Sequence, residues 1–317
     1  MIICYLYHSS KIHIKNAKKN ELSKNALGVN QLHWLDQLHQ VLVVGNYGQG
    51  TIKSYLAEIR LLFHYYHEID VEQISEQDIL NYMIFIKTVH GVGRAKCRSV
   101  AQSCSFFYKN VIKQPFVLPS KLYPRKEFVL PAVMTNTQIK QLFSGTTDNR
   151  QRAVISLLYG CGMRLGEVQQ LKMTDIERAN NRILIRQGKG NKDRYVLLPK
   201  YVLQELEHYY RCYRPKIYLL ESKQIPNRPL HVRSVQTIVN AAMTSSGFES
   251  GKFTSHSLRH SFATHMLDQG CDIHTIKTLL GHSKIETTMI YLHLQQSKRD
   301  TIISPIDQLL NNDRPVQ

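Results

Sequence analysis

The chain has 317 residues, of which 43% are hydrophobic and 21% charged, a balance that excludes a disordered or membrane-embedded protein. At about 150 residues per domain, this length predicts two domains, each large enough for its own core. The 41 lysines and arginines exceed the 24 aspartates and glutamates, and the resulting net charge of +17 favours a nucleic acid as partner over a membrane surface, because the positive charge is not gathered on one amphipathic helix.

The sequence also predicts a reducing, cytoplasmic setting without membrane contact. No stretch approaches the roughly 18 apolar residues that a membrane span requires. The amino terminus lacks the basic leader and apolar block of a secretory signal. The six cysteines form no Cys-x-x-Cys pair, so we expect reduced thiols rather than structural zinc or a disulfide framework.

Residues 1–27 form a basic, weakly patterned N-terminal extension, and residues 28–114 are predicted to fold as four helices. Apolar side chains recur at offsets of three and four from Ile52 to Tyr66, which marks one face of a helix. Three weaker series of the same kind surround it. Trp34 is expected in the core of this unit rather than on a base-stacking surface. The expected helix breakers are Gly45, Gly48, Gly50, Gly91 and Gly93.

Prolines and cations interrupt the helical pattern at residues 115–131, which we predict to be an interdomain linker. The second domain, 132–317, is again mostly helical. Thr135 and Gln138 have capping-box spacing and predict a helix start. Two β-prone runs, 182–186 and 194–198, flank a basic, glycine-rich segment and predict a hairpin.

The segment 255–265 is the densest in chemically active side chains. On a helix, His256 and Arg259 lie on one face, a combination suited to binding phosphate and moving a proton. His256 and His260 have a metal-ligand spacing, but Arg259 would repel a metal and no glutamate stands between them. We therefore expect no metal. Taken alone, the pair is better explained as a surface arginine and a half-buried histidine.

Three other segments have an unusual composition for ordinary helices. Glycines lie close to Arg164 and directly precede His282, where they would let the backbone come close to a ligand. Lys189 lies in the glycine-rich tip of the predicted hairpin. Tyr291 follows the second glycine segment and, taken alone, would be a core or interface aromatic.

Together these segments resemble the tyrosine recombinase family, also called the phage integrase family, which includes Xer-type recombinases and integron integrases. The resemblance implies a mainly α, two-domain fold. A four-helix, SAM-like core-binding domain would occupy 28–114, and a mostly helical catalytic domain with a small β-hairpin would occupy 132–317. Five motifs carry it in family order: Gly162–Glu167, Gly188–Lys192, His256–His265, Leu279–His282 and Thr287–Tyr291.

The resemblance implies a site-specific DNA recombinase or integrase. It would cut and rejoin strands through a 3′-phosphotyrosine intermediate without metal, ATP or another cofactor. Tyr291 would be the nucleophile. Arg164 and Arg259 would hold the phosphate oxygens, and Lys189, with Lys192 as the alternative, would protonate the 5′-oxygen.

The remaining roles are also implied by the family. His256 would act as a general acid or base, and His282 would support the phosphate. Glu167 would orient an arginine rather than transfer a proton. His260 and His265 are expected to be packing or helix-surface histidines, and the Ser283–Glu286 spacing predicts the start of the helix that presents Tyr291. The expected catalytic residues are Arg164, Lys189, His256, Arg259, His282 and Tyr291.

The implied partner is double-stranded DNA with specific recombination sites. Four subunits would assemble on two sites, as a homo-tetramer or with a related recombinase. The apolar residues after Tyr291 would dock on a neighbouring subunit or pack on their own domain. Two alternatives remain at this stage: a type IB topoisomerase, which shares the chemistry but exchanges no partners, and a DNA-binding protein that has lost catalysis.

Overall fold

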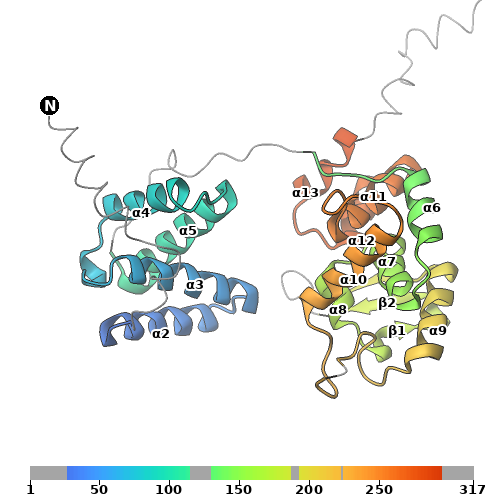
Figure 1. The fold of residues 1–317 in the computed structure, drawn as a ribbon, viewed down its shortest axis with the longest axis horizontal. Coiled ribbons are helices and arrows are strands. Elements are labelled where there is room, and N and C mark those ends of the chain that lie inside the picture. Colours follow the sequence, from blue (N-terminus) through green and yellow to red (C-terminus); the bar gives the residue numbers. More distant parts are fainter. Residues whose placement is uncertain (1–26, 115–129, 187–192, 223, 295–317) are drawn as a thin grey trace, which may run out of the picture. The chain divides into compact units, whose positions relative to one another are not determined.

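A computed structural model describes residues 27–114, 130–186, 193–222 and 224–294 (Figure 1). The chain divides into two compact units, one within residues 1–127 and the other within 128–317. The predicted linker at 115–131 lies almost entirely outside the described residues, as do the N-terminal extension and the apolar residues beyond 294.

The first unit contains the four helices that the apolar spacing predicts. Gly28, Gly48 and Gly93 each provide an extended N-cap, and Gly45 ends the first helix. Ser75 accepts a hydrogen bond from the amide of Asp78 and so caps the third helix with its side chain. The helices are α2 (Val29–Val44), α3 (Gln49–Tyr65), α4 (Glu76–Thr88) and α5 (Arg94–Phe107), followed by a short π-helix at Tyr108–Ile112.

The predicted apolar faces of these helices form one core. Leu38, Ile59 and Phe107 are fully buried in it. Trp34 is half-buried against this core, and its indole N–H donates to Glu72 Oε1 at 2.9 Å. The expectation that Trp34 belongs to the core is confirmed for the ring, whose polar edge stays at the surface.

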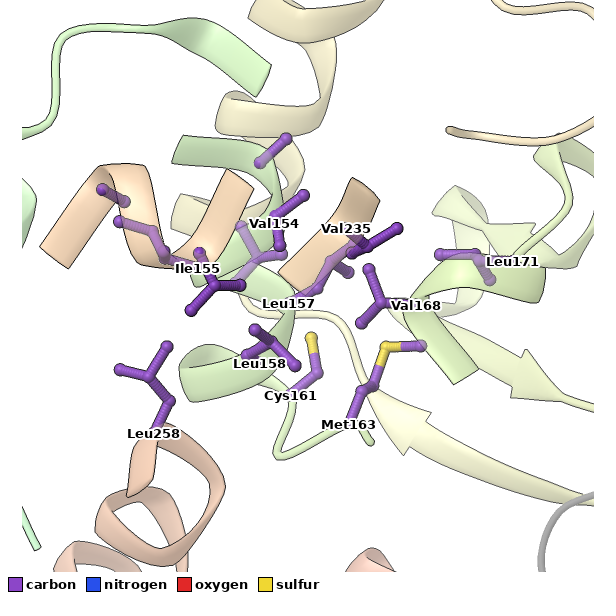
Figure 2. Packing of buried hydrophobic residues seen from close by; sticks show 14 of the residues in the cluster. Val154, Ile155, Leu157, Leu158, Cys161, Met163, Val168, Leu171, Val235 and Leu258 are labelled. Carbon is purple, nitrogen blue, oxygen red and sulfur yellow. The ribbon is translucent and has the colours of Figure 1, made fainter. Parts of the chain in front are cut away.

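The second unit surrounds one central helix. Six consecutive residues of α7, 153–158, are buried, which requires neighbours on every side of the helix. Figure 2 shows Leu157 of α7 beside Val235 of α10 and Val168 of α8. The helices of this unit are α6 (Asn136–Gly145), α7 (Asn149–Gly160), α8 (Leu165–Gln170), α9 (Lys200–Tyr213), α10 (Val232–Ser245), α11 (Ser255–Asp268), α12 (Ile273–Leu280) and α13 (Glu286–Met289).

A small antiparallel sheet lies between α8 and α9 in the chain. The predicted hairpin is present as β2 (Arg182–Ile185) and β3 (Arg194–Leu197), with Ile183 opposite Val196. A two-residue strand, β1 (Ile176–Glu177), pairs with β2 and was not predicted, because two residues carry no readable alternation. The glycine-rich tip lies outside the described residues.

The predicted cap at Thr135 is confirmed, and the one at Ser283 is wrong. The Thr135 hydroxyl accepts from the amide of Gln138, and the Gln138 side chain accepts from the amide of Thr135. The last helix, α13, starts instead from Ile285, which has helical dihedrals and no side-chain cap. Tyr291 follows this four-residue helix rather than lying within a long one.

Two further findings concern the described residues as a whole. No helix in these ranges is long and apolar enough to cross a membrane. Five of the cysteines, all except Cys4 in the extension, are described, and all five are free thiols.

Candidate active site

The first motif places Arg164 directly before α8. After α7 the chain turns through Gly162, whose φ is +61°, and Arg164 follows in extended conformation as the N-cap. Glu167 Oε2 accepts the Arg164 backbone N–H at 2.8 Å, and Glu167 Oε1 accepts Nη1 of the same arginine at 2.8 Å. Arg164 Nη2 also donates to the carbonyl of Gly281 at 3.1 Å. The role expected for Glu167, orienting an arginine, is therefore visible in the hydrogen bonds.

Glu167 also binds a second arginine, which the sequence did not single out. Arg194, the first residue of β3, donates both terminal nitrogens to the two Glu167 oxygens at 2.8 Å. Its Nε donates to the carbonyl of Leu279 at 3.2 Å. Burial alone would raise the pKa of Glu167, but Arg194 and Arg164 hold it at about 2. The carboxylate thus stays charged at neutral pH.

Arg259 is the most deeply buried of the site's arginines, with 4% of its surface exposed. It donates to the carbonyls of Gly162 and Leu280, each at 2.5 Å, and so fixes the turn after α7 to the end of α12. Its nearest carboxylate oxygen, on Glu167, is 4.0 Å away. Burial and the charge of Arg164 lower the pKa of Arg259 to about 9, so the group remains a cation at neutral pH.

His282 joins this network through both ring nitrogens. Arg259 Nη2 lies 3.3 Å from Nε2, and Thr288 Oγ1 lies 3.0 Å from Nδ1. A guanidinium only donates, so we assign Nε2 as the acceptor and place the proton on Nδ1, which then donates to Thr288. Thr288 is fully buried in α13 and links His282 to the segment that carries Tyr291.

Tyr291 is buried beside the arginines, with 1% of its surface exposed. Its hydroxyl oxygen lies 3.0 Å from His260 Nδ1. Burial raises the pKa of Tyr291 to about 12, although Arg259 and Arg164 act in the opposite direction. The phenol is therefore protonated at neutral pH, and two cations are close enough to favour its ionised form.

The two histidines of α11 that were considered as metal ligands have different surroundings. His256 is exposed in the first turn, and its ring centre is 6.5 Å from that of His260. His260 is half-buried and is in contact with Tyr291. The expectation that His260 only packs or lies on the helix surface missed this hydrogen bond. His265, one turn further along, hydrogen-bonds Tyr159 and fits that expectation.

Five of the six expected catalytic residues lie in the described ranges, and the fold connects four of them. His256 is exposed, and its ring centre lies 6.5 Å from that of His260. Arg164, Arg259 and His282 belong to one hydrogen-bonded network around the end of α12, and Tyr291 is connected to it through Thr288. Lys189 and its alternative Lys192 lie outside the described residues. Arg194, at the start of β3 in the same hairpin, is hydrogen-bonded to Glu167 and to the carbonyl of Leu279.

Net charge is the outstanding property of this site. Three guanidinium groups, from Arg164, Arg194 and Arg259, share the single carboxylate of Glu167. The excess positive charge is partly or fully buried away from water. An anion that reached this site would therefore be bound strongly. The arrangement suits a phosphate diester placed within reach of the Tyr291 hydroxyl.

Comparisons with known proteins identify the family of both units. Residues 132–298 match the phage integrase family, and residues 34–117 match the phage integrase N-terminal SAM-like domain. Tyrosine recombinase XerC of Pediococcus pentosaceus is 32% identical over 275 residues, which cover 80% of this chain and 90% of that protein.

Solved structures show the same fold. XerH recombinase, in a post-cleavage complex with its difH substrate, is 22% identical with a TM-score of 0.62, over 84% of this chain and 83% of that one. A lambda integrase tetramer bound to a Holliday junction is 17% identical with a TM-score of 0.63, over 89% of this chain and 84% of that one.

Proposed function

Because this chain belongs to the phage integrase family and is a tyrosine-type site-specific recombinase, we propose that Tyr291 is the nucleophile that cuts its DNA. The Tyr291 oxygen attacks a backbone phosphorus, the bond from phosphorus to the 5′-oxygen breaks, and the strand leaves as a free 5′-hydroxyl. The 3′-phosphotyrosine keeps the energy of the ester. A second 5′-hydroxyl then attacks it and releases Tyr291, so ATP is not required.

The observation that carries this proposal is the excess of buried positive charge next to the tyrosine. Arg164 and Arg259 are oriented by Glu167 and by backbone carbonyls, so their directions are set before a substrate arrives. In the transition state, negative charge gathers on the non-bridging oxygens of the phosphate. Preoriented guanidinium donors stabilise that charge without a metal ion.

The proton transfers are assigned to the other family positions. Lys189, with Lys192 as the alternative, gives a proton to the departing 5′-oxygen. His256, exposed at the start of α11, acts as a general acid or base near the phosphate. His282 supports the phosphate from its position between Arg259 and Thr288.

The substrate we propose is double-stranded DNA with two recombination sites, bound by four subunits. Support comes from the related proteins: XerH is bound to its difH substrate, and lambda integrase forms a tetramer on a Holliday junction. The four subunits are identical, or two of them come from a related recombinase. The first unit, which matches the N-terminal SAM-like domain, would hold the DNA together with the catalytic unit.

The test is a covalent-adduct assay on a nicked or suicide duplex taken from the genomic neighbourhood of the gene. Wild type and Tyr291→Phe are incubated with the duplex without metal or ATP and run on a denaturing gel. We expect an adduct with wild type and none with the variant. Equal adducts in both would disprove the role of Tyr291. A two-site exchange assay then separates recombination from the simple relaxation of a topoisomerase.

A further inference from the structure

His260 is the hydrogen-bond partner of the proposed nucleophile. Its Nδ1 lies 3.0 Å from the Tyr291 hydroxyl oxygen, and the two ring centres are 5.6 Å apart. Among the described residues, this is the only hydrogen bond of that hydroxyl. The roles proposed above assign a donor for the 5′-oxygen, ligands for the phosphate and an acid or base role for His256. None of the described residues given those roles is hydrogen-bonded to the Tyr291 hydroxyl.

The surroundings of His260 keep its ring neutral. The residue is half-buried on α11, and His256 and Arg259 of the same helix are its cationic or titratable neighbours. Burial, together with these two groups, lowers the pKa of His260 to about 4. A neutral imidazole has one ring nitrogen free to accept, and the protonated phenol of Tyr291 can donate to it.

The position of the ring is set by the same helix that sets the phosphate site. Arg259, the preceding residue, is fixed by the carbonyls of Gly162 and Leu280. The backbone of His260 therefore cannot shift without moving a phosphate-binding arginine. The hydroxyl, the imidazole and the guanidinium are held in one arrangement, as proton transfer during attack requires.

We propose that His260 is the general base of the reaction, which takes the proton of Tyr291 as its oxygen attacks phosphorus. This inference rests on the proposed function of Tyr291. In cleavage, the O–H bond of Tyr291 breaks, the proton moves to His260 Nδ1, the oxygen–phosphorus bond forms, and the 5′-oxygen leaves with a proton from Lys189. In rejoining, the incoming 5′-hydroxyl gives its proton to Lys189 as its oxygen bonds to phosphorus, the bond from phosphorus to Tyr291 breaks, and the imidazolium returns its proton to the departing Tyr291 oxygen. His256, whose ring is exposed, is left to act at the phosphate.

The test uses variants that keep the hydrogen bond but not the basicity. In His260→Asn, the amide oxygen can stand where Nδ1 stands and accept from Tyr291, but it cannot take the proton. We expect the rate of adduct formation on the suicide duplex to fall about 100-fold or more, the usual contribution of a general base. His260→Gln is the second variant, should the asparagine variant fail to fold.

His265→Asn is the matched control. His265 lies on the same helix, is also half-buried, and its Nδ1 is 3.0 Å from the hydroxyl of Tyr159. The control therefore makes the same substitution in a histidine–tyrosine pair with the same 3.0 Å separation outside the site. We expect its adduct rate to stay within about threefold of wild type. Equal losses in both variants would mean that a general disturbance of α11, and not a base, explains the effect.

Two rescue measurements distinguish whether His260 acts as a general base or only positions Tyr291. The first replaces Tyr291 alone among the 17 tyrosines with a fluorinated tyrosine of lower pKa, introduced by codon suppression. That nucleophile needs less help in losing its proton. It should restore most of the rate lost in His260→Asn, and failure to do so would overturn the proposal.

The second uses a duplex with sulfur in place of the bridging 5′-oxygen. A thiolate leaves without a proton, so this substrate should rescue Lys189→Ala but not His260→Asn. Rescue of the His260 variant would assign it to the leaving group instead and overturn the proposal. Absence of any adduct with wild type would disprove the proposed function itself, whereas a wild-type adduct with an unimpaired His260→Asn would disprove only this inference.

Discussion

At the scale of single residues, the site depends on one buried carboxylate. Glu167 is the only acidic group within 4.0 Å of the three site arginines among the described residues, and it forms hydrogen bonds to two of them. Removing it would leave buried cations without a counter-charge. That cost is far larger than the cost of breaking an exposed ion pair.

We therefore expect Glu167→Gln to lower the free energy of unfolding by about 3–5 kcal/mol, the usual result of breaking a buried pair. Urea denaturation followed by circular dichroism measures it. Glu177→Gln, which breaks the exposed pair with Arg182, is the control and should leave the midpoint where it is in wild type. A Glu167→Gln midpoint equal to that of wild type would contradict the central role of this carboxylate.

His260 should make the stability of the fold depend on pH. Its pKa is about 4 in the folded chain and near 6.5 in a model peptide, so the unfolded chain binds more protons between these values. The free energy of unfolding should therefore fall as the pH drops from about 6.5 to about 4. His260→Asn should make that fall shallower, which urea midpoints over this range will measure. Parallel curves for the two proteins would count against the buried, neutral state of His260.

At the scale of elements, the end of α12 holds the site together. Gly281 ends this helix with a φ of +61°, and its carbonyl accepts from Arg164. A Cβ there would come within 2.8 Å of Arg194 Cδ and Nε. The glycine is therefore required both by its backbone conformation and by the close approach of the arginine.

Gly281→Ala should consequently impair both folding and cleavage. We expect a loss of more than about 1 kcal/mol from the strained backbone and a lower adduct rate from the displaced Arg194. Gly270→Ala is the matched control, because Gly270 also has a positive φ, +91°, with open space around its Cβ. It should lose stability through the backbone alone and keep its adduct rate. A Gly281→Ala protein as active as Gly270→Ala would disprove the effect on Arg194.

Local sequence patterns predicted the elements well where a helix or hairpin carries its own signal. The four helices of the first unit, the β2–β3 hairpin and the Thr135 cap are all present as expected. The Ser283 cap failed because capping spacing is only a local preference, and here the chain enters a four-residue helix from Ile285. At the start of α13, the packing of the chain against neighbouring residues outweighs the capping preference of Ser283.

Local sequence patterns could not predict contacts between residues that lie far apart in the chain. The glycines near Arg164 and before His282 were expected to admit a ligand. Gly166 has open space where its Cβ would stand, but a Cβ at Gly162 would meet Phe262 and one at Gly281 would meet Arg194. The His260–Tyr291 and Glu167–Arg194 bonds join residues 31 and 27 positions apart. No helical or strand periodicity relates such positions, so only the tertiary fold shows them.

At the scale of the whole molecule, the net charge of +17 and the positive charge of the site have different effects. The surface charge attracts DNA over long distances through solvent and is screened by salt. The charge around Glu167 is withdrawn from water and acts at contact distance. Binding should therefore respond to salt, and the chemical step should not.

Salt titration tests this separation. We expect the affinity for a duplex without recombination sites to fall by about 10³-fold or more between about 50 and 200 mM salt, as for proteins that contact several phosphates. Fluorescence anisotropy measures it. The adduct rate at saturating protein should change little over the same range. A loss of affinity below about tenfold would mean that few of the cations reach the DNA.

Arg164→Lys isolates the geometry of the site from its charge, because the chain keeps its net charge of +17. A lysine cannot bind Glu167 and a phosphate through one planar fork, so the donors at the reacting phosphate lose their fixed direction. We expect duplex affinity and its salt dependence to match wild type, while the adduct rate falls about 10²–10³-fold, the usual cost of one transition-state donor. If affinity and rate fell together, binding by overall charge and catalysis by oriented charge would not be separable in this protein.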